Sequence, residues 1–481
     1  MLIEFVGQSV QDSSNIAVNP ARLINCYREL VLSQGKTQHV LQSVLGQAQT
    51  DGIGDNAVRA MGSGNGSNWL AGGGKLYELS DPGMVTERAA IADDANTTIS
   101  GNYSDVTAVS GGNYYLWDGV SITQPTTKTF TSVGSHAYVG GYTVISELDG
   151  KRFQWSDLGD ASSLDALNFS SADKVDDSIL RLIEVQGNLL VMCERSSELW
   201  QTTGQAGTEA FGYVTSWNRG LKSFNLVTRF DDTLFFVGND NNVYVGLGGG
   251  AVDITTPGLN TALTNNDPTH CYYYEDRGHK FCVVRFSDRP AWVYDVKMQE
   301  WHERAEGAGY TEWRGVATIK GDKWQVGNTD GEIMALTRTN RDLNGPLRRQ
   351  AISKPVYLGD EKFIVNKLEI NARVGENTLN LAENFGLSLR DGFMLSVGGG
   401  FGLRVGSVGA DERDATLTLF ESKDGGRTWG EGKPRSMGKS GDYSKRMIWR
   451  ARGQANQYAI RVDIDEPADI PISTTAVVDI Q

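Results

Sequence analysis

Two short His–Cys groupings are the residues whose types could bind a metal ion. His270 directly precedes Cys271, and His279 lies three residues before Cys282. Zinc needs four ligands that converge tetrahedrally. The two groupings fall on the arms of a hairpin that we predict to turn at residues 276–278, and side chains on such arms alternate between two faces. No second Cys/His pair lies nearby in the sequence, so we expect no metal ion and no cofactor here.

Adjacent carboxylates are the residues whose types could hydrolyse a glycosidic bond. Aspartate pairs occur at residues 93–94, 176–177 and 231–232. Glycoside hydrolysis needs two carboxylates at a set separation across the scissile bond, whereas neighbouring acids on a strand or turn point apart. We therefore interpret these pairs as solvated turn residues. The sequence has no G-x-S-x-G, H-E-x-x-H or P-loop motif, and we predict no catalytic residues.

Residues 422–429 match the Asp-box pattern S-x-D-x-G-x-T-W, which is similar to a hairpin turn of sialidase propellers and other β proteins. We predict that Asp424 accepts hydrogen bonds from turn N–H groups, that Gly426 has a positive φ and that Trp429 packs under the hairpin. A single copy indicates a structural turn. A sialidase would also need an arginine cluster and a Tyr/Glu pair.

Basic residues are concentrated in one segment, 422–452, which we call the basic segment. It holds three acidic residues, and its nine basic residues give a local excess of six positive charges in a chain of net charge −14. An ordinary basic surface is one interpretation. The other is a docking patch for an acidic partner ring, or a local DNA contact. The basic residues are Lys423, Arg427, Lys433, Arg435, Lys439, Lys445, Arg446, Arg450 and Arg452.

The composition indicates which elements position these residues. Glycine makes up 57 of 481 residues, and there are 11 Trp, 17 Tyr and 16 Phe, a combination typical of many short strands joined by tight turns. The acidic balance argues against a globally basic nucleic-acid clamp. The four cysteines form no CxxC pair and are expected to be buried thiols. We see no secretory signal and no apolar run of about 18 residues, so we expect no membrane partner.

A repeat of about 35–45 residues runs through the first two thirds of the chain. Each copy has a strand of small residues, a Gly/Asn/Asp turn and an aromatic strand. Several strands per repeat at this period are the signature of a β-propeller, here with six or seven blades. The copies are residues 69–79, 107–117, 136–155, 183–200, 234–245, 272–301 and 316–336.

The repeats divide the chain into three parts. Residues 1–50 lack repeat character and are interpreted as an N-terminal arm or lead-in strand, and residues 51–345 form the β-propeller. The pattern breaks near residues 338–350. Residues 351–481 alternate between apolar and polar positions and are predicted to form a C-terminal β-sandwich-like domain. The expected fold class is all-β.

Several segments, in their order and spacing, resemble one family over most of the chain. That family is the tail hub, or packaged-DNA stabilisation protein (tail accessory factor), of short-tailed bacteriophages. The segments include Asn19 to Glu29, Arg152-Phe153 with Trp155-Ser156, Asp176-Asp177, Glu198-Leu199-Trp200, Arg219-Gly220-Leu221, Gly278-His279 with Phe281, Trp301-His302-Glu303-Arg304, and Trp449 followed by Gly453-Gln454 and Ile460-Arg461-Val462.

The resemblance implies a structural virion protein located in the tail and made in the bacterial host cytoplasm. It implies a ring, usually of six copies, below the portal and its adaptor. This ring would continue the DNA channel, retain the packaged genome and seat a tail needle, plug or fibres. Genomic DNA would pass without sequence-specific contacts. The resemblance implies no catalytic residues and makes Trp301, His302 and Arg304 blade-packing residues. The alternatives are a propeller glycosidase or sialidase-like tail enzyme and a generic propeller interaction module.

Overall fold

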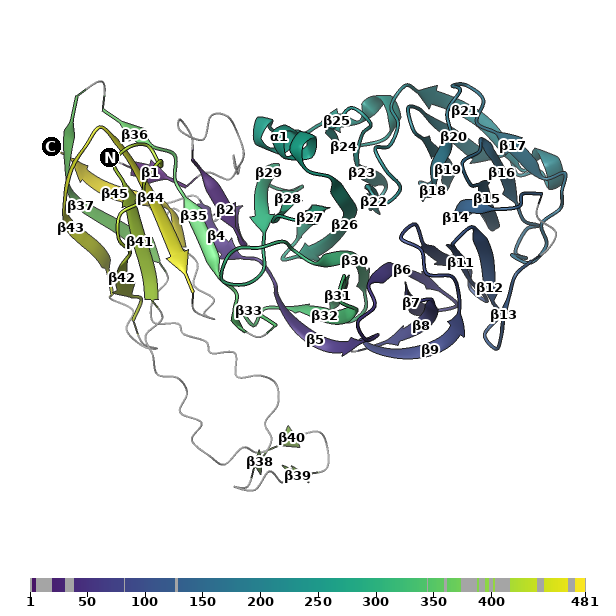
Figure 1. The fold of residues 1–481 in the computed structure, drawn as a ribbon, viewed down its shortest axis with the longest axis horizontal. Coiled ribbons are helices and arrows are strands. Elements are labelled where there is room, and N and C mark those ends of the chain that lie inside the picture. Colours follow the sequence, from purple (N-terminus) through teal and green to yellow (C-terminus); the bar gives the residue numbers. More distant parts are fainter. Residues whose placement is uncertain are drawn as a thin grey trace. The chain divides into compact units, whose positions relative to one another are not determined.

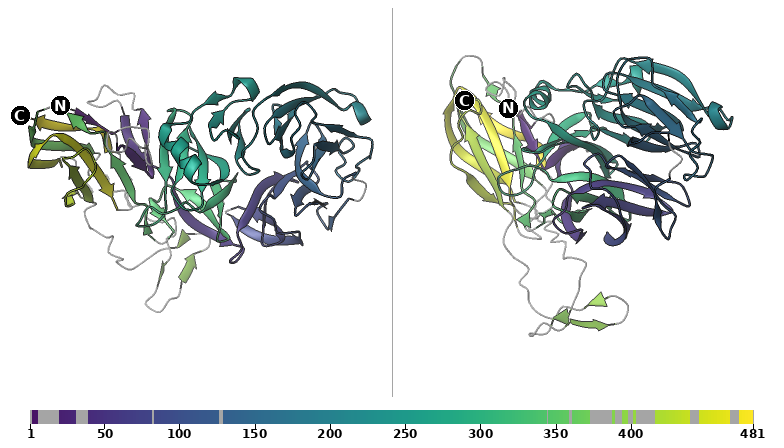
Figure 2. Two further views of the ribbon diagram at one scale, coloured as in Figure 1. Left: turned by 45° about the horizontal axis from the view of Figure 1, so that its top comes forward. Right: turned by 45° about the vertical axis from the view of Figure 1, so that its right-hand side comes forward.

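The chain divides into two compact units in the computed structural model (Figures 1 and 2). Unit 1 comprises Met1–Ala48, Met298–Thr311 and Thr337–Gln481, and unit 2 comprises Gln49–Lys297 and Glu312–Leu336. The domain limits predicted from the sequence stay a prediction. The structure describes residues 2–5, 20–30, 39–81, 83–125, 129–343, 345–358, 361–372, 387–388, 394–397, 401–402, 416–438, 445–465 and 472–480.

Unit 2 is a β-propeller whose antiparallel strand groups surround a common centre (Figure 1). Its described residues form seven blades, numbered here in chain order, at the upper end of the predicted range. Blades 1 to 4 are β6 (Val58–Gly64), β7 (Ser67–Gly72), β8 (Lys75–Ser80) and β9 (Met84–Ala90); β10 (Thr98–Gly101), β11 (Val106–Ser110), β12 (Asn113–Trp117) and β13 (Ile122–Thr123); β14 (Val133–Val139), β15 (Tyr142–Glu147), β16 (Arg152–Trp155) and β17 (Phe169–Ser171); and β18 (Ile179–Val185), β19 (Asn188–Cys193), β20 (Ser197–Thr202) and β21 (Phe211–Trp217).

The last three blades follow the same order, from an inner strand outwards. Blade 5 is β22 (Val227–Phe230), β23 (Thr233–Val237), β24 (Val243–Val245) and β25 (Val252–Asp253); blade 6 contains β26 (Pro268–Asp276), β27 (His279–Phe286) and β28 (Ala291–Asp295); blade 7 is β30 (Gly315–Lys320), β31 (Trp324–Asn328), β32 (Glu332–Thr337) and β5 (Gly46–Gly52). The helical elements are η1 (Gly207–Glu209), η2 (Gly248–Gly250) and α1 (Pro257–Asn265).

Tight turns whose central residues have positive φ connect neighbouring strands within the blades. They join the first and second strands of a blade, or its second and third strands. The turns at Gly111-Gly112 and Gly140-Gly141 have both central residues at positive φ, as does the turn at Arg277-Gly278, with φ of 50° and 74°. Two-residue turns of this kind match the right-handed twist of antiparallel strands. The predicted turn at residues 276–278 is confirmed, because Asp276 pairs with His279 across it.

Blade 7 and blade 1 pack against each other and close the propeller. Their shared apolar cluster includes Ile53, Val58, Leu70 and Ile333. The chain before blade 1 also contributes directly, since β5 supplies the outer strand of blade 7 and Thr50 Oγ1 donates to the carbonyl of Ile333 at 3.0 Å. The propeller strand that comes first in the sequence, β5, therefore pairs within the last blade.

Unit 1 contains a β-sandwich, as the sequence predicts for its C-terminal part. One sheet has the order β3-β4-β45-β37-β43, with β1 beside β45; the other runs β29-β2-β35-β44-β41-β42, with β36 beside β44. The strands are β1 (Leu2–Glu4), β2 (Arg22–Ile24), β3 (Cys26–Leu30), β4 (His39–Ser43), β29 (Glu300–Arg304), β35 (Arg349–Ile352), β36 (Val356–Tyr357), β37 (Phe363–Ala372), β41 (Thr416–Ser422), β42 (Lys433–Ser436), β43 (Met447–Ala455), β44 (Gln457–Ile464) and β45 (Ile472–Ile480).

The core of this sandwich draws on both ends of the chain. Ile3 and Leu23 from the N-terminal strands share one buried cluster with Leu368, Trp449 and Tyr458. Short strands outside the two sheets are β33 (Arg341–Asp342), β34 (Gly345–Pro346), β38 (Leu387–Ser388), β39 (Met394–Val397) and β40 (Phe401–Gly402). No helix in the described residues is both long and apolar enough to cross a membrane.

Phe153 provides a test of blade packing. It is fully buried between blades 3 and 4, with its ring centroid 5.1 Å from that of Trp200 in an edge-to-face arrangement. Phe153→Ala should lower the free energy of unfolding by about 3–5 kcal/mol, measured by chemical denaturation. Phe169→Ala, in the same blade but at a 44% exposed position, is the control and should cost about 0.5 kcal/mol or less. Equal effects of the two substitutions would contradict the packing of these blades.

Candidate functional site

The Asp-box turn has the Asp424 hydrogen bonds and the positive φ at Gly426 that the sequence predicts. Asp424 accepts hydrogen bonds from the Thr428 backbone N–H at 2.9 Å and from its hydroxyl at 2.6 Å, and Ser422 Oγ donates to Asp424 at 2.7 Å. Gly426 has φ of +94°. Trp429 is half-buried, with its ring centroid 5.6 Å from the Arg461 guanidinium. The turn is thus held by its own side chains.

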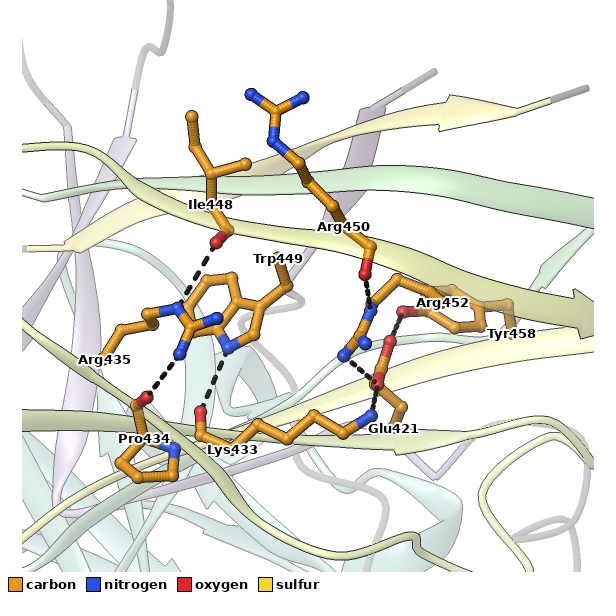
Figure 3. A network of polar contacts seen from close by, with 9 residues as sticks. All are labelled: Glu421, Lys433, Pro434, Arg435, Ile448, Trp449, Arg450, Arg452 and Tyr458. Atoms are coloured by element: carbon orange, nitrogen blue, oxygen red, sulfur yellow. Dashed lines mark hydrogen bonds and ion pairs between the residues drawn. The ribbon is translucent and has the colours of Figure 1, made fainter.

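The Asp-box turn lies next to a buried carboxylate that organises part of the basic segment (Figure 3). Glu421 is 7% exposed and forms ion pairs with Lys433 at 2.6 Å and Arg452 at 3.1 Å. The hydroxyl of Tyr458 also donates to this carboxylate. The two cations offset the cost of burying the glutamate, so they serve the fold of the sandwich.

Further basic side chains of the segment are engaged within the sandwich. Arg446 forms an ion pair with Glu369 at 2.6 Å. Arg435 donates to the carbonyls of Pro434 and Ile448, and its guanidinium lies 5.9 Å from the ring centroid of Trp449. The excess positive charge of the basic segment is therefore partly neutralised by Glu421 and Glu369, two carboxylates that lie outside residues 422–452.

Of the remaining basic residues, Lys445 is partly buried and donates to Ser436 Oγ at 3.1 Å, and three others are exposed. Lys423, Arg427 and Arg450 are exposed and have no carboxylate at ion-pair distance in the described part of the chain. Figure 3 shows the Arg450 side chain extending away from the Glu421 network. We call these three residues the exposed basic patch. Lys439 lies outside the described residues.

The propeller encloses a central pore of about 760 Å³ in unit 2. Inner strands of all seven blades line it, and its walls carry both positive and negative groups. Arg229 forms an ion pair with Glu184, and Lys280 forms one with Asp231. The side-chain amide of Asn225 donates to the carbonyl of Ala95 at 2.9 Å, which joins blade 5 to the loop before blade 2. This pore is the size of a small-ligand pocket.

The His and Cys residues singled out in the sequence do not converge. His279 is fully buried and bonds through Nδ1 to Asp295 at 2.6 Å, whereas His270 lines the pore. All four cysteines are buried free thiols, as predicted. Burial raises the pKa of Cys271 and Cys282. The described residues contain no group of three or more His, Cys, Asp or Glu placed to hold a metal ion.

The aspartate pairs have separate partners. Asp93 forms an ion pair with Arg59 at 2.9 Å, and Asp176 forms one with Lys151. The expectation of a solvated turn residue is wrong for Asp177, which is 5% exposed and accepts hydrogen bonds from the backbone N–H of Arg195 at 2.7 Å and of Ser196 at 2.9 Å. Its role is to hold a turn, which the sequence pattern did not indicate.

The three residues that the family resemblance assigns to packing are all buried. Trp301, His302 and Arg304 are 1%, 2% and 2% exposed and lie on β29, which belongs to unit 1, so their assignment to blade packing stays a prediction. The ring of His302 lies 6.1 Å from that of Tyr27.

Asp424 provides a test of the Asp-box turn. Its replacement by alanine leaves turn donors unpaired and should lower the free energy of unfolding by about 1–3 kcal/mol at pH 7. Burial opposes ionisation of Asp424, but hydrogen bonds from Thr428 and Ser422 outweigh it and lower its pKa from 3.8 to about 2. A lowered folded-state pKa contributes stability above the unfolded-state value, and this stability is lost as the pH falls through the folded-state value.

The difference between wild type and Asp424→Ala should therefore shrink between pH 4 and pH 2, measured by urea denaturation. Asp424→Asn, which retains one acceptor oxygen, serves as the control and should fall between the two. An Asp424→Ala protein as stable as wild type at pH 7 would show that the carboxylate does not hold the turn.

Comparison with known protein families finds two matches in chain order. The model described as "Bacteriophage P22 Gp10, beta-propeller" matches residues 23–341, and the model described as "Bacteriophage P22 Gp10, beta-sandwich" matches residues 399–478. The first match alone spans about two thirds of the chain. No curated protein sequence matches.

Two solved structures are similar to part of the chain. The computationally designed Ika8 protein is 10% identical, with 60% of this chain and 99% of that chain covered and a TM-score of 0.38. The Pan2 WD40 domain of Neurospora crassa is 8% identical, with 61% and 95% covered and a TM-score of 0.42. Both scores are too low to bear on function.

Proposed function

Because the chain belongs to the bacteriophage P22 Gp10 family, whose members are structural tail-hub proteins of the virion, we propose that it forms a hexameric ring below the portal and its adaptor. The ring continues the DNA channel, helps retain the packaged genome and seats a tail needle, plug or fibre. The observation that carries this proposal is the ordered match of both family domains. The family places the chain in the virion tail and implies assembly with other tail and portal components.

The size of the propeller pore supports a DNA path formed between copies of the chain. The pore holds about 760 Å³ and is bridged by the Asn225–Ala95 hydrogen bond. A cube of 760 Å³ has edges of about 9 Å, shorter than the width of about 12 Å of the major groove of B-form DNA alone, so this pore cannot pass a duplex. A conduit for the genome therefore has to run along a surface shared by several copies, as in a ring.

The charge of the chain suits a conduit that does not hold DNA. With 45 basic and 59 acidic residues, the chain offers few positive charges to replace the counter-ions of the phosphates. Many of its described cations are also engaged by carboxylates of the same chain. We infer that the surface along which DNA moves is neutral or acidic, so that the genome slides without sequence-specific contact.

A non-enzymatic role is part of the proposal. A sialidase-like or other glycosidase tail enzyme would need free carboxylates facing one another at a propeller mouth. In the pore, Glu184 is paired with Arg229 and Asp231 with Lys280. The Asp box is a structural turn in unit 1. Glycan hydrolysis by the purified chain would overturn this part of the proposal.

We further propose that the exposed basic patch docks an acidic partner protein of the tail. Charged groups of this kind speed encounter and fix register more than they add affinity. Arg446 and Arg452 are unsuitable for testing the patch, because they form ion pairs with the buried glutamates of the sandwich, Glu369 and Glu421 respectively. Lys423 and Arg450 are exposed and can be reversed without breaking such a pair.

Lys423→Glu/Arg450→Glu should join the tail about tenfold more slowly than wild type at low salt. The measurement is rescue of DNA-filled particles that lack this protein, scored as particles that keep their DNA. The gap to wild type should narrow as salt increases, because salt screens exposed charges. Lys354→Glu/Lys362→Glu makes the same change in net charge at two exposed positions of unit 1 and is the control.

Two results would contradict this assignment. The first is equal joining by the patch variant and the control. The second is tight duplex binding by the isolated wild-type chain that is lost in Lys423→Glu/Arg450→Glu, which would make the patch a DNA contact.

A further inference from the structure

One end of the propeller pore brings together basic and imidazole side chains from four blades. Arg59 lies on β6, His136 on β14, Arg181 on β18 and His270 on β26, and all four line the pore. The inner strand is the first of the strands given above for each blade. Each of these four residues lies in the first half of its inner strand or at the middle of that strand. They form what we call the basic end of the pore.

The groups at the basic end act on one another electrostatically. Burial, and next the positive charge of Arg181, lowers the pKa of His136 to about 3. Burial, and next the charges of Arg285, Arg59 and Arg181, lowers the pKa of His270 to about 3. Both imidazoles are therefore neutral at physiological pH, and the guanidinium of Arg181 is within electrostatic reach of both.

Arg181 differs from the other cations of the pore. Arg59 is paired with Asp93 at 2.9 Å, Arg229 with Glu184, and Lys320 with Glu275 at 3.4 Å. Within the described residues Arg181 has no carboxylate at ion-pair distance, and its guanidinium lies 4.4 Å from the ring centroid of Phe224. Burial lowers its pKa to about 10. A cation enclosed by protein is normally paired with an anion.

Three residues of the basic end each carry a buried nitrogen atom without a hydrogen-bond partner. Nε of Arg181, Nε2 of His136 and Nδ1 of His270 are buried and make no hydrogen bond within the described chain. His136 is only 3% exposed, and its other ring nitrogen is held by Thr98 Oγ1 at 2.5 Å. Buried polar atoms are almost always hydrogen-bonded, and the three residues that carry these atoms all line the same polar pore.

We propose that the basic end of the pore binds one small inorganic oxyanion of the phosphate class, with the Arg181 guanidinium as its main ligand. The planar guanidinium matches the oxygens of phosphate bidentately. A neutral imidazole can donate one N–H, so His136 and His270 can add hydrogen bonds from blades 3 and 6. The pore volume is ample for such an ion, and the bound anion ties together inner strands of separate blades.

The test is phosphate binding by the full chain in a low-salt buffer, by isothermal titration calorimetry and by melting temperature. Wild type should bind one phosphate per chain and melt at increasing temperature as phosphate is added. Arg181→Met should bind at least tenfold more weakly. It should also melt above wild type without phosphate, because an uncompensated cation has been removed, and below wild type at saturating phosphate.

Controls separate this site from general salt effects. Lys320→Met removes a pore cation that already has a carboxylate partner and should keep wild-type phosphate affinity. Sodium chloride at matched ionic strength should not reproduce the phosphate effect. Arg181→Lys keeps the charge without the planar fork and should bind with intermediate affinity, which retains a readout if Arg181→Met does not fold.

The proposal is overturned if wild type shows no saturable phosphate binding. It is equally overturned if Arg181→Met binds as wild type does, or if chloride stabilises wild type and variants alike. It does not depend on ring formation, since the isolated chain is measured, and failure of either proposal leaves the other standing.

Discussion

Mutual coverage of the blades is the constraint on which the propeller depends. A four-stranded blade has two apolar faces, and only its neighbours can cover them. Val109 and Tyr114 of blade 2 share a cluster with Val133 and Ile145 of blade 3, and the same relation recurs around the propeller. The first and last blades must therefore meet, and β5 secures that meeting by lying beside β32.

Charge pairing is the second recurrent feature, and it links fold to function. The chain is acidic overall, and its basic segment is used partly to neutralise the buried carboxylates of Glu421 and Glu369. Within this segment, the described basic residues that are exposed and lack a carboxylate at ion-pair distance are Lys423, Arg427 and Arg450. This distribution is the basis on which we propose a protein partner at the exposed basic patch and a DNA path without tight binding.

The sequence was most informative where local chemistry determines local structure. Hairpins could be predicted at Gly111-Gly112 and Arg277-Gly278, because two-residue turns need residues that tolerate a positive φ. The hydrogen bonds that Asp424 accepts in its turn could be predicted from the Asp-box pattern. The all-β class and the propeller followed by a sandwich could be read from the repeat and from strand alternation.

Partnerships between distant segments could not be read in the same way. Strand β5 is rich in Gly and Gln and has no apolar alternation, because an outer strand has little surface to bury. No feature of the sequence of residues 46–52 predicts that this strand pairs with β32. Likewise, Glu421 pairs with Lys433 and Arg452 only because β41, β42, β43 and β44 bring them together. The basic end of the pore needs four blades to exist at all.

The proposed function depends on this chain forming a ring in the virion tail. Electron cryomicroscopy of DNA-filled particles rebuilt with the purified chain would show whether it does. We expect a closed ring of six copies below the portal, in which each copy fits the propeller and the sandwich, with the DNA path on the ring axis outside every propeller pore. A chain absent from the tail, or one bound as single copies away from the axis, would contradict it.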